Sequence, residues 1–305
     1  MKVFTTWEEI ENIAPTVLAL GNFDGVHAGH QTLIAHAVKN AEAAKLKSAV
    51  FTFSNHPKDD QVKNILVAGE KTRIMAELGV AYLFNMPFDA SIMGLAAEAF
   101  IHEKLLAKLN MREVWCGFNY KFGHQAAGNP ELLVREGIQS GFEVHVLPPV
   151  IIDGEVVSSS LIRRRIEAGD MEACRRLLGR HYAIDGTVVV GNKIGRTIGF
   201  PTSNLIIDAS MASPANGVYI THSLYGGARF PSITNVGVKP TIGQFQKNVE
   251  THIFDFEKEL YGEKMRIEFL KKMRDECKFD DVDALKKQIA KDCALAKAFH
   301  GKNFT

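Results

Sequence analysis

The sequence has few cysteines and no long apolar segment, and both shortages exclude whole classes of protein. Its four cysteines lie far apart and form no Cys-x-x-Cys pair, which argues against a disulfide framework and a structural zinc site. This usage favours a reduced, cytoplasmic setting. No apolar run approaches the roughly 20 residues that span a bilayer. Residues 1–15 carry three glutamates and lack the apolar core of a secretory signal.

The sequence also lacks an excess of charge of one sign, and it lacks two common phosphate-binding motifs. Lysine and arginine number 36 against 35 aspartates and glutamates, so the formal net charge is +1. We therefore expect no broad basic field that would hold nucleic acid. Neither a Walker A motif nor G-x-G-x-x-G occurs. This balance of positive and negative charge suits small charged substrates that a few nearby side chains bind. We expect no nucleic-acid or membrane partner, and weak self-association stays an open alternative.

The sequence divides into two parts with different residue patterns, and 305 residues are enough to form two hydrophobic cores. In the first part, strand-like runs such as TVLALG (16–21) alternate with helix-like segments, which predicts a mostly parallel sheet with helices on both faces. Near RLLGRHY (176–182) the pattern changes to short strand-like runs separated by glycine and proline, which predicts a small β-barrel or β-sandwich. An amphipathic end predicts a closing helix. The predicted domains are 1–181 and 182–305.

A glycine-rich turn follows the run TVLALG and carries two histidines, in the stretch GNFDGVHAGH from Gly21 to His30. Ligands of open parallel sheets bind beyond the carboxyl ends of the strands, and the start of the next helix offers free N–H groups that favour phosphate. His27 and His30 are three residues apart and share a helix face. Two imidazoles there can donate to phosphate oxygens and stabilise a charged transition state. Gly21 permits close backbone approach, and Asp24 is expected to cap the helix.

Two other interpretations of this stretch stay open. One is an ordinary strand-to-helix turn with incidental polar residues. The other is a metal site, because histidine is a common metal ligand, although no cysteine or obvious third histidine lies nearby.

Three further stretches offer groups that suit phosphate or a flat aromatic ligand. SSSLIRRRI (158–166) places hydroxyls at a helix start and a guanidinium at Arg163, which can bind phosphate and neutralise pyrophosphate. A simple helix cap with a basic solvent face is the alternative. FTFSNHP (51–57) and GFNYKFG (117–123) combine aromatic and amide groups, which suit an isoalloxazine or adenine ring. Aromatic residues of these loops are equally well explained as core, so the amide of Asn119 is the better binding candidate.

The second part carries its own candidate chemistry. A glycine-rich loop leads into PTSN, where Thr202 and Asn204 are two residues apart and share a strand face. A hydroxyl and an amide oxygen suit Mg²⁺, with waters and ATP phosphates completing the shell, whereas a plain turn and strand start is the alternative. Glu250, in the strand-like VETHIFDF (249–256), is either solvated at an edge or held with a raised pKa as a base for an alcohol. Spacing does not decide between these alternatives.

Taken in order, the motifs resemble those of bacterial bifunctional riboflavin kinase/FAD synthetases over nearly the whole chain. GNFDGVHAGH is similar to the H-x-G-H signature of nucleotidyltransferases, which implies an α/β Rossmann-like domain that adenylylates FMN. Serine stands at 160 where this family usually has threonine. The implied catalytic residues of this domain are His27, His30 and Arg163. The implied ATP- and phosphate-binding residues are Gly21, Asn22, Phe23, Asp24, Ser158, Ser159 and Ser160. The implied flavin-binding residues are His56, Pro57, Asn119, Tyr120 and Phe122.

From Gly186 onward the sequence resembles the riboflavin kinase domain, which implies a small Greek-key β-barrel with a C-terminal helix. The resemblance implies that Glu250 deprotonates the riboflavin 5′-hydroxyl and that Thr202 and Asn204 bind Mg²⁺ and ATP. Ser203 stands where alanine is common. The implied ATP-binding residues are Gly191, Lys193, Gly195, Arg196 and Thr202, and the implied flavin-binding residue is Arg274.

The resemblance therefore predicts two reactions, with Mg²⁺ as cofactor and ATP as co-substrate. Riboflavin and ATP would give FMN in the C-terminal domain, and FMN and ATP would give FAD and pyrophosphate in the N-terminal domain. The FMN phosphate is already anionic, so the second reaction needs no general base. Three rivals remain: a paralogue with one working domain, a flavin-binding regulator without turnover, and another nucleotidyltransferase such as a cytidylyltransferase. The key positions are all filled, which argues against the first two, and the kinase half argues against the third.

Overall fold

The computed structural model describes residues 1–55, 62–67, 69–191, 194–241 and 244–303. The chain divides into two compact units, each described here by itself. The first comprises Met1–Val62 and Ala68–Ser159, and the second comprises Lys63–Val67 and Ser160–Thr305. The boundary predicted at 181/182 concerns which residues carry each activity, and it stays a prediction.

The first unit is built on a six-stranded sheet in the order β1-β4-β3-β2-β5-β6. All its pairings are parallel, as the alternation of strands and helices predicts. Its strands are β1 (Lys2–Phe4), β2 (Thr16–Leu20), β3 (Lys47–Phe53), β4 (Tyr82–Met86), β5 (Met111–Gly117) and β6 (Glu143–Leu147). A separate hairpin pairs β7 (Ile151–Ile152) with β8 (Glu155–Val156).

The helices of this unit lie between successive strands from β2 to β6. They are α1 (Ala28–Ala44), α2 (Glu70–Glu77), α3 (Ala90–Met93), α4 (Ala97–Ala99), the π-helical η1 (Phe100–Leu106), the 3₁₀ turn η2 (His124–Ala126) and α5 (Pro130–Ser140). All five residues of β2 are buried, and Leu18, Leu20 and Phe51 belong to the apolar core. This core fixes the carboxyl ends of β2, β3 and β5, from which the three predicted ligand loops begin.

The second unit is a six-stranded antiparallel barrel in the order β10-β13-β12-β11-β14-β9. A bridge between Val189 and Asn204 joins the chain after β9 to β10 and nearly closes the ring. Its strands are β9 (Tyr182–Thr187), β10 (Ser203–Ile206), β11 (Gly217–Tyr225), β12 (Ala228–Thr241), β13 (Gln244–Ile253) and β14 (Lys264–Arg274). The predicted parallel-sheet domain and β-barrel domain are thus both confirmed.

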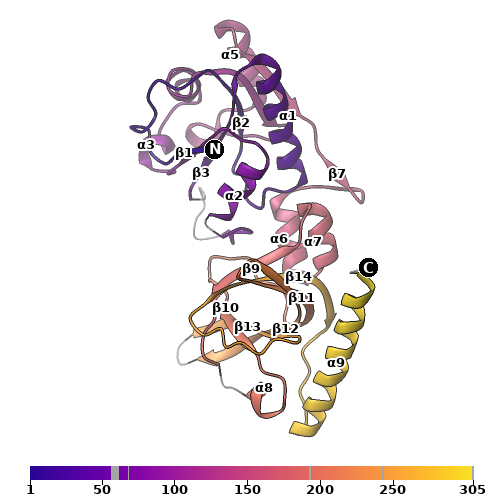
Figure 1. Cartoon of the computed structure of the whole chain (residues 1–305). Coiled ribbons are helices and arrows are strands. Elements are labelled where there is room, and N and C mark those ends of the chain that lie inside the picture. The colour runs from indigo at the N-terminus through magenta and orange to yellow at the C-terminus, as the bar shows by residue number, and fades with distance from the viewer. Residues whose placement is uncertain (56–61, 68, 192–193, 242–243, 304–305) are drawn as a thin grey trace. The chain divides into compact units, whose positions relative to one another are not determined.

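Four helices accompany the barrel: α6 (Ser159–Ala168), α7 (Met171–Leu178), α8 (Ile194–Thr197) and α9 (Val282–Asn303). Helix α9 runs along the outside of the barrel (Figure 1), where Cys293 and Ala296 pack on apolar side chains of the strands. Asp281 caps it, because its Oδ1 accepts from the backbone N–H of Ala284 at 2.7 Å. The predicted closing helix is confirmed.

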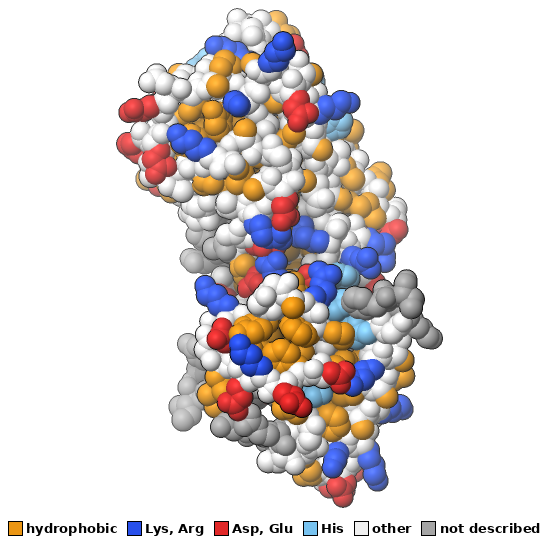
Figure 2. Space-filling view, in the orientation of Figure 1, with side chains coloured by type: hydrophobic (Ala, Val, Ile, Leu, Met, Phe, Trp, Pro, Cys, Tyr) orange, Lys and Arg blue, Asp and Glu red, His pale blue; other side chains and the backbone are white. Residues whose placement is uncertain are grey.

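On the face drawn in Figure 2, basic and acidic side chains are interspersed on both units. This distribution follows from the nearly equal numbers of the two kinds of residue. Among the described residues, no helix is both long enough and apolar enough to cross a membrane.

Candidate active sites

The first candidate site lies where β2 ends and α1 begins. Phe23, Gly25 and Val26 have φ angles of 50°, 80° and 36°, so the chain turns sharply in the left-handed region before the helix. His27 is the N-cap of α1, and its Nδ1 accepts from the backbone N–H of His30 at 3.3 Å. The prediction that Asp24 caps this helix is therefore wrong, because the left-handed turn separates it from the first helical residues.

The two histidine rings stack face to face, with centroids 3.6 Å apart and planes 14° apart. The spacing of three residues predicted this proximity, although His27 lies just outside the helix. The ring of Phe23 is fully buried and lies edge-on to His30, at 5.0 Å between centroids. A Cβ at Gly21 would lie only 3.1 Å from that ring, so glycine lets the two approach. Phe23 can therefore reach a phosphate only through its backbone.

The surroundings of His30 favour the neutral form of its ring. Burial, with His27 and Lys71 beside it, lowers the pKa of His30 well below its ordinary value. Its Nδ1 is buried and has no hydrogen-bond partner among the residues that the structure describes. An unsatisfied buried polar atom is costly, and such atoms in native proteins call for a functional explanation.

The serine-rich segment divides between the two units. Ser159 Oγ donates to the backbone carbonyl of Asp24 at 2.8 Å, which joins the start of α6 to the histidine turn. Ser158 is half-buried next to it. Ser160 and Arg163 belong to the second unit, where Arg163 Nε donates to the carbonyl of Lys63 at 2.6 Å.

Of the three flavin contacts predicted in the loop after β5, one is exposed and two are packed beneath it. Phe122 is 7% exposed and belongs to the core, and Tyr120 stacks on it at 5.6 Å between ring centroids. Burial raises the pKa of the Tyr120 phenol. The side chain of Asn119 is exposed and available to a ligand. Of the other predicted flavin contacts in this unit, His56 and Pro57 lie outside the described residues.

The second candidate site contains a cavity of about 350 Å³ between the barrel and α9, which we call the helix cavity. Its size is typical of a small-molecule site. Its apolar wall includes Ile198, Phe200, Val218, Ile233 and Leu285. Its polar wall includes Thr202, Asn235, Glu250, Arg274 and Asp292.

A row of polar side chains crosses the strands beside this cavity. Glu250 pairs in register with Asn204 of β10 and with Asn235 of β12. Asn248 Nδ2 lies 3.2 Å from Asn204 Oδ1 and 3.1 Å from Glu250 Oε1, so one amide donates to both. Sequence analysis missed Asn248, although the period of two along a strand places it on the face of Glu250.

The oxygen atoms here fit a magnesium ion. Thr202 offers a hydroxyl and Asn204 a 5%-exposed amide whose Oδ1 is oriented by Asn248, and hard oxygen donors of this kind suit Mg²⁺. A Cβ at Gly191 would lie 2.5 Å from Asn204 Nδ2, so glycine is needed there. Gly195 is likewise pressed against the carbonyl of Phe200. Lys193 and the side chain of Arg196 lie outside what the structure describes.

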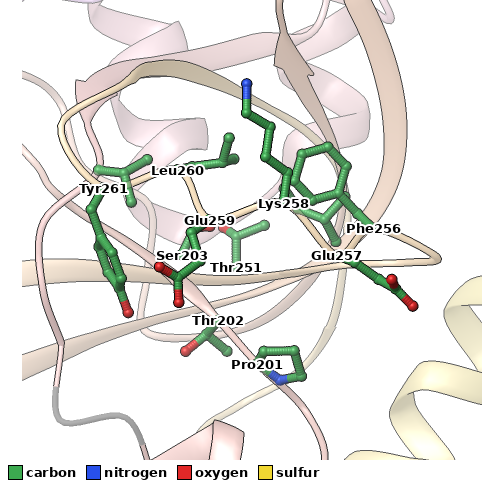
Figure 3. A pocket seen from close by; sticks show the side chains of 12 residues that line it. Pro201, Thr202, Ser203, Thr251, Phe256, Glu257, Lys258, Glu259, Leu260 and Tyr261 are labelled. Carbon is green, nitrogen blue, oxygen red and sulfur yellow. The ribbon is translucent and has the colours of Figure 1, made fainter.

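A second cavity of about 390 Å³, the strand cavity, lies beside the first, and Thr202 lines both. Thr202, Ser203 and Thr251 supply hydroxyls on one side, and the segment 256–261 forms the other (Figure 3). In this view Tyr261 extends its hydroxyl toward Ser203 and Thr202, whereas Lys258 points away from them. Apart from Thr202, sequence analysis did not identify these residues, because no motif marks the segment 256–261.

Arg274 is anchored to α9 at the edge of the helix cavity. Its Nε and Nη2 lie 3.0 and 2.8 Å from Asp292 Oδ2, and Asp292 is 3% exposed. Gln288 Nε2 donates to the other oxygen of Asp292 at 2.8 Å. Helix α9 therefore fixes the orientation of the predicted flavin-binding guanidinium.

One group of side chains elsewhere has the spacing of metal ligands: Glu113, Glu143 and His145. Glu113 Oε1 accepts from Asn40 Nδ2 and Trp115 Nε1, each at 2.7 Å, and lies 3.2 Å from His145 Nε2. These three neighbours all lie against the same oxygen of the buried carboxylate.

Comparisons with known proteins agree with this geometry. A family model described as FAD synthetase matches residues 9–161, and one described as Riboflavin kinase matches residues 178–300. A bifunctional riboflavin kinase/FMN adenylyltransferase of Haemophilus influenzae is 35% identical, over 92% of this chain and 93% of that protein. Its counterpart in Listeria monocytogenes is 35% identical, over 97% and 95%. A crystal structure from Streptococcus pneumoniae, titled as a macrolide-efflux protein, is 31% identical with a TM-score of 0.89, over 99% of both chains.

Proposed function

The chain belongs to the bifunctional riboflavin kinase/FMN adenylyltransferase family, and from this premise we propose which of its residues carry the two activities. It phosphorylates riboflavin with ATP to FMN, and it adenylylates FMN with ATP to FAD. We assign the adenylyltransferase to residues 1–181 and the kinase to residues 182–305. Use of ATP as the phosphate donor favours a cytoplasmic location.

In the kinase, riboflavin occupies the helix cavity and ATP occupies the strand cavity. The observation that carries this assignment is the position of Thr202, which lines both cavities, while Glu250 lines the first. Glu250 takes the proton of the riboflavin 5′-hydroxyl as that oxygen attacks the γ-phosphorus in line, and ADP leaves. Phosphoryl transfer of this kind depends mainly on positioning and on charge stabilisation. Phe200 and Ile233 offer the isoalloxazine ring an apolar wall, and Arg274 holds its edge.

Thr202 and Asn204 would hold Mg²⁺ in the kinase site. The ion would neutralise the charge of the ATP phosphates when it is bound. Asn248 keeps the Oδ1 of Asn204 oriented and holds Glu250 next to it. Gly191 and Gly195 let the loop before β10 approach closely, and Lys193 and Arg196 of that loop complete the ATP contacts.

In the adenylyltransferase, an oxygen of the FMN phosphate attacks the α-phosphorus of ATP, and pyrophosphate leaves. His27, His30 and the N–H groups at the start of α1 stabilise the charge on the reacting phosphates. The backbone from Gly21 to Asp24 lies against ATP. Ser158, Ser159 and Ser160 offer hydroxyls to the phosphates, and Arg163 neutralises the leaving pyrophosphate. Asn119, His56 and Pro57 bind the flavin, with Tyr120 and Phe122 forming the platform beneath it.

Two variants of the whole chain test these assignments in one assay that separates riboflavin, FMN and FAD. His30→Ala is expected to lower adenylylation by about 100-fold, because donors aimed at developing charge contribute this much. It should leave FMN formation within twofold of the wild type. Glu250→Gln is expected to lower FMN formation by about 100-fold or more, with adenylylation of added FMN unchanged. Equal loss of both activities in either variant would contradict separate sites.

A further inference from the structure

Lys71 lies in the first turn of α2, and its ammonium contacts both predicted ligand loops of the first unit. Nζ lies 3.2 Å from the carbonyl oxygen of Asn22, in the histidine turn. It lies 3.4 Å from Thr52 Oγ1 and 3.3 Å from the carbonyl oxygen of Phe53, at the end of β3. Thr52 Oγ1 also donates to the Asn22 carbonyl at 2.9 Å. One side chain thus ties the turn after β2 to the loop FTFSNHP.

None of these contacts neutralises the positive charge of Lys71. An ammonium has three donors, and its three acceptors here are uncharged oxygen atoms. Burial lowers the pKa of Lys71, and the carboxylate of Asp24 partly opposes this effect. A positive charge whose hydrogen-bond acceptors are uncharged, and which the Asp24 carboxylate offsets in part, is therefore held at the edge of the sheet where the phosphates are expected. Such a charge attracts anions more strongly than it would in water.

The same charge acts on His30. The groups that face this ring are His27, which stacks on it, the apolar ring of Phe23, and Lys71. Burial is the main reason that the pKa of His30 is low, and the positive charges of His27 and Lys71 add to it. Stacked at 3.6 Å, the two imidazoles would repel each other if both were charged.

We propose that Lys71 is a positioning residue of the adenylyltransferase site, which locks the ATP turn to the flavin loop and keeps His30 an uncharged hydrogen-bonding partner for phosphate. The proposal rests on the placement of adenylylation at His27 and His30. Lys71 acts through its neighbours, because its donors are already used by Asn22, Thr52 and Phe53. Displacement of either loop by about 1 Å would be enough to lower the rate about 100-fold.

The test compares Lys71→Met with Lys71→Arg in the whole chain, with riboflavin kinase activity as the internal control for the amount of protein and thermal unfolding by circular dichroism as the control for folding. Lys71→Met is expected to lower kcat for adenylylation by about 10- to 100-fold, with FMN formation within twofold. Lys71→Arg keeps the charge and the donors, so it should stay within about threefold of the wild type. Glu77→Gln is the matched control, because Glu77 is an exposed residue of α2 that pairs with Arg73. It should change neither activity.

A second measurement separates this role from general stabilisation of the fold. The imidazole resonances of His30, assigned with His30→Ala, are titrated by NMR in each variant. Removing the charge of Lys71 should move the titration of His30 upward by about 0.5 pH units or more, whereas Lys71→Arg should not move it.

Four results would overturn the proposal. They are adenylylation within twofold of the wild type in Lys71→Met, an unmoved His30 titration in that variant, a loss in Lys71→Arg as large as in Lys71→Met, or an equal loss in Glu77→Gln. If Lys71→Met does not fold, the rate of adenylylation by Lys71→Arg is the test. A rate within about threefold of the wild type supports the proposal, and a larger loss contradicts it. Retained adenylylation in His30→Ala would show instead that the site placement, and with it the premise for Lys71, is wrong.

Discussion

At the scale of single residues, Asn248 joins the proposed metal ligand to the proposed base. Its side-chain amide donates both to Asn204 and to Glu250, and the residue is 8% exposed. Without it, Asn204 loses the donor that orients its oxygen, and the Glu250 carboxylate loses a hydrogen bond in a partly buried setting. Hydrogen bonds to charged groups contribute about 1.5–3 kcal/mol each.

Asn248→Ala is therefore expected to raise the Mg²⁺ concentration for half-maximal FMN formation and to lower kcat, each by about 10-fold, since 1.4 kcal/mol corresponds to a factor of ten. Adenylylation by the same variant serves as the control, and its Mg²⁺ dependence should not change. The measurement is a Mg²⁺ titration of both reactions in a metal-buffered assay. A kinase with unaltered Mg²⁺ dependence in Asn248→Ala would separate Asn248 from the metal site, and full kinase activity in excess chelator would remove the metal role itself.

Residues whose role depends on local spacing could be predicted from the sequence, and residues whose role depends on distant partners could not. His27 and His30 meet because they are three apart at the start of a helix, which the local sequence pattern predicts. Lys71 could not be found, because its partners are two backbone carbonyls and a hydroxyl on separate segments of the chain. His27 caps α1, although Asp24 was expected to do so. The chain turns sharply before the helix through positive φ angles at Phe23, Gly25 and Val26, and no residue pattern in the sequence predicts this turn.

At the scale of elements, periodicity predicted the long strands and helices and failed for the short ones. Strand β1 has three residues, too few to show alternation, and it is held by its pairing with β4. The stretch GLAAEAFIHEKLLAKLN (94–110) predicts one helix, but the structure is helical only over 97–106, and most of that segment, η1, has π-helical pairing. Neither cavity of the kinase half could be predicted, because each is assembled from elements distant in the sequence.

Helix α9 packs against the barrel through a group of buried histidines near its C-terminal end. His300 of α9 lies with its ring centroid 5.1 Å from that of His222 of β11. His222 is 5% exposed, and burial, with His300, Arg229 and His181 nearby, lowers its pKa to about 4. Glu268 is the carboxylate that faces it, at 3.8 Å from Nδ1. Because the unfolded chain binds this proton near pH 6.5, the contribution of neutral His222 is complete above that pH and is lost as pH falls toward 4.

Acidification from pH 7 to 5 is therefore expected to destabilise the packing of α9 by up to about 2 kcal/mol. Hydrogen exchange of the α9 amides, corrected for the intrinsic effect of pH, measures this as a loss of protection of up to about 30-fold. His222→Gln removes this titrating group but leaves His300 and His181, whose pKa values burial also lowers, so its protection should fall less than that of the wild type over the same range. If the variant and the wild type lose protection equally, another group is responsible.

At the scale of the whole molecule, the product of one activity is the substrate of the other, and the two activities use different architectures in one chain. The order of motifs predicted this organisation, and the matches to both family models and to whole-length relatives confirm it. Composition alone could not give the extent of the structural units. The second unit comprises Lys63–Val67 and Ser160–Thr305. Helix α7 packs on β14 and β9, and a bridge joins Asn64 of the short segment to Met211. The sequences of α6 and α7 show only the amphipathic pattern that many helix pairs share, and this pattern does not reveal which unit they belong to.

The two boundaries make different predictions for fragments of the chain. Helix α7 packs on β14 and β9 and buries Met171, Cys174, Leu177 and Leu178, each at most 4% exposed. Burial of each such side chain contributes about 1.5–3 kcal/mol, so their sum is comparable to the whole stability of a domain. A fragment of residues 160–305 is expected to fold and phosphorylate riboflavin, whereas a fragment of residues 182–305 should aggregate or unfold at a much lower temperature.

Both fragments lack Lys63–Val67 and with it the bridge between Asn64 and Met211, so their difference isolates the contribution of α6 and α7. Circular dichroism during heating and FMN formation from riboflavin are measured on each fragment. Equal melting temperatures and equal kinase activity would place the working boundary at 181/182, and α7 would then be a connection that the barrel can lose. Because α7 covers apolar residues of two barrel strands at once, we expect the shorter fragment to fail in folding first and in catalysis only as a consequence.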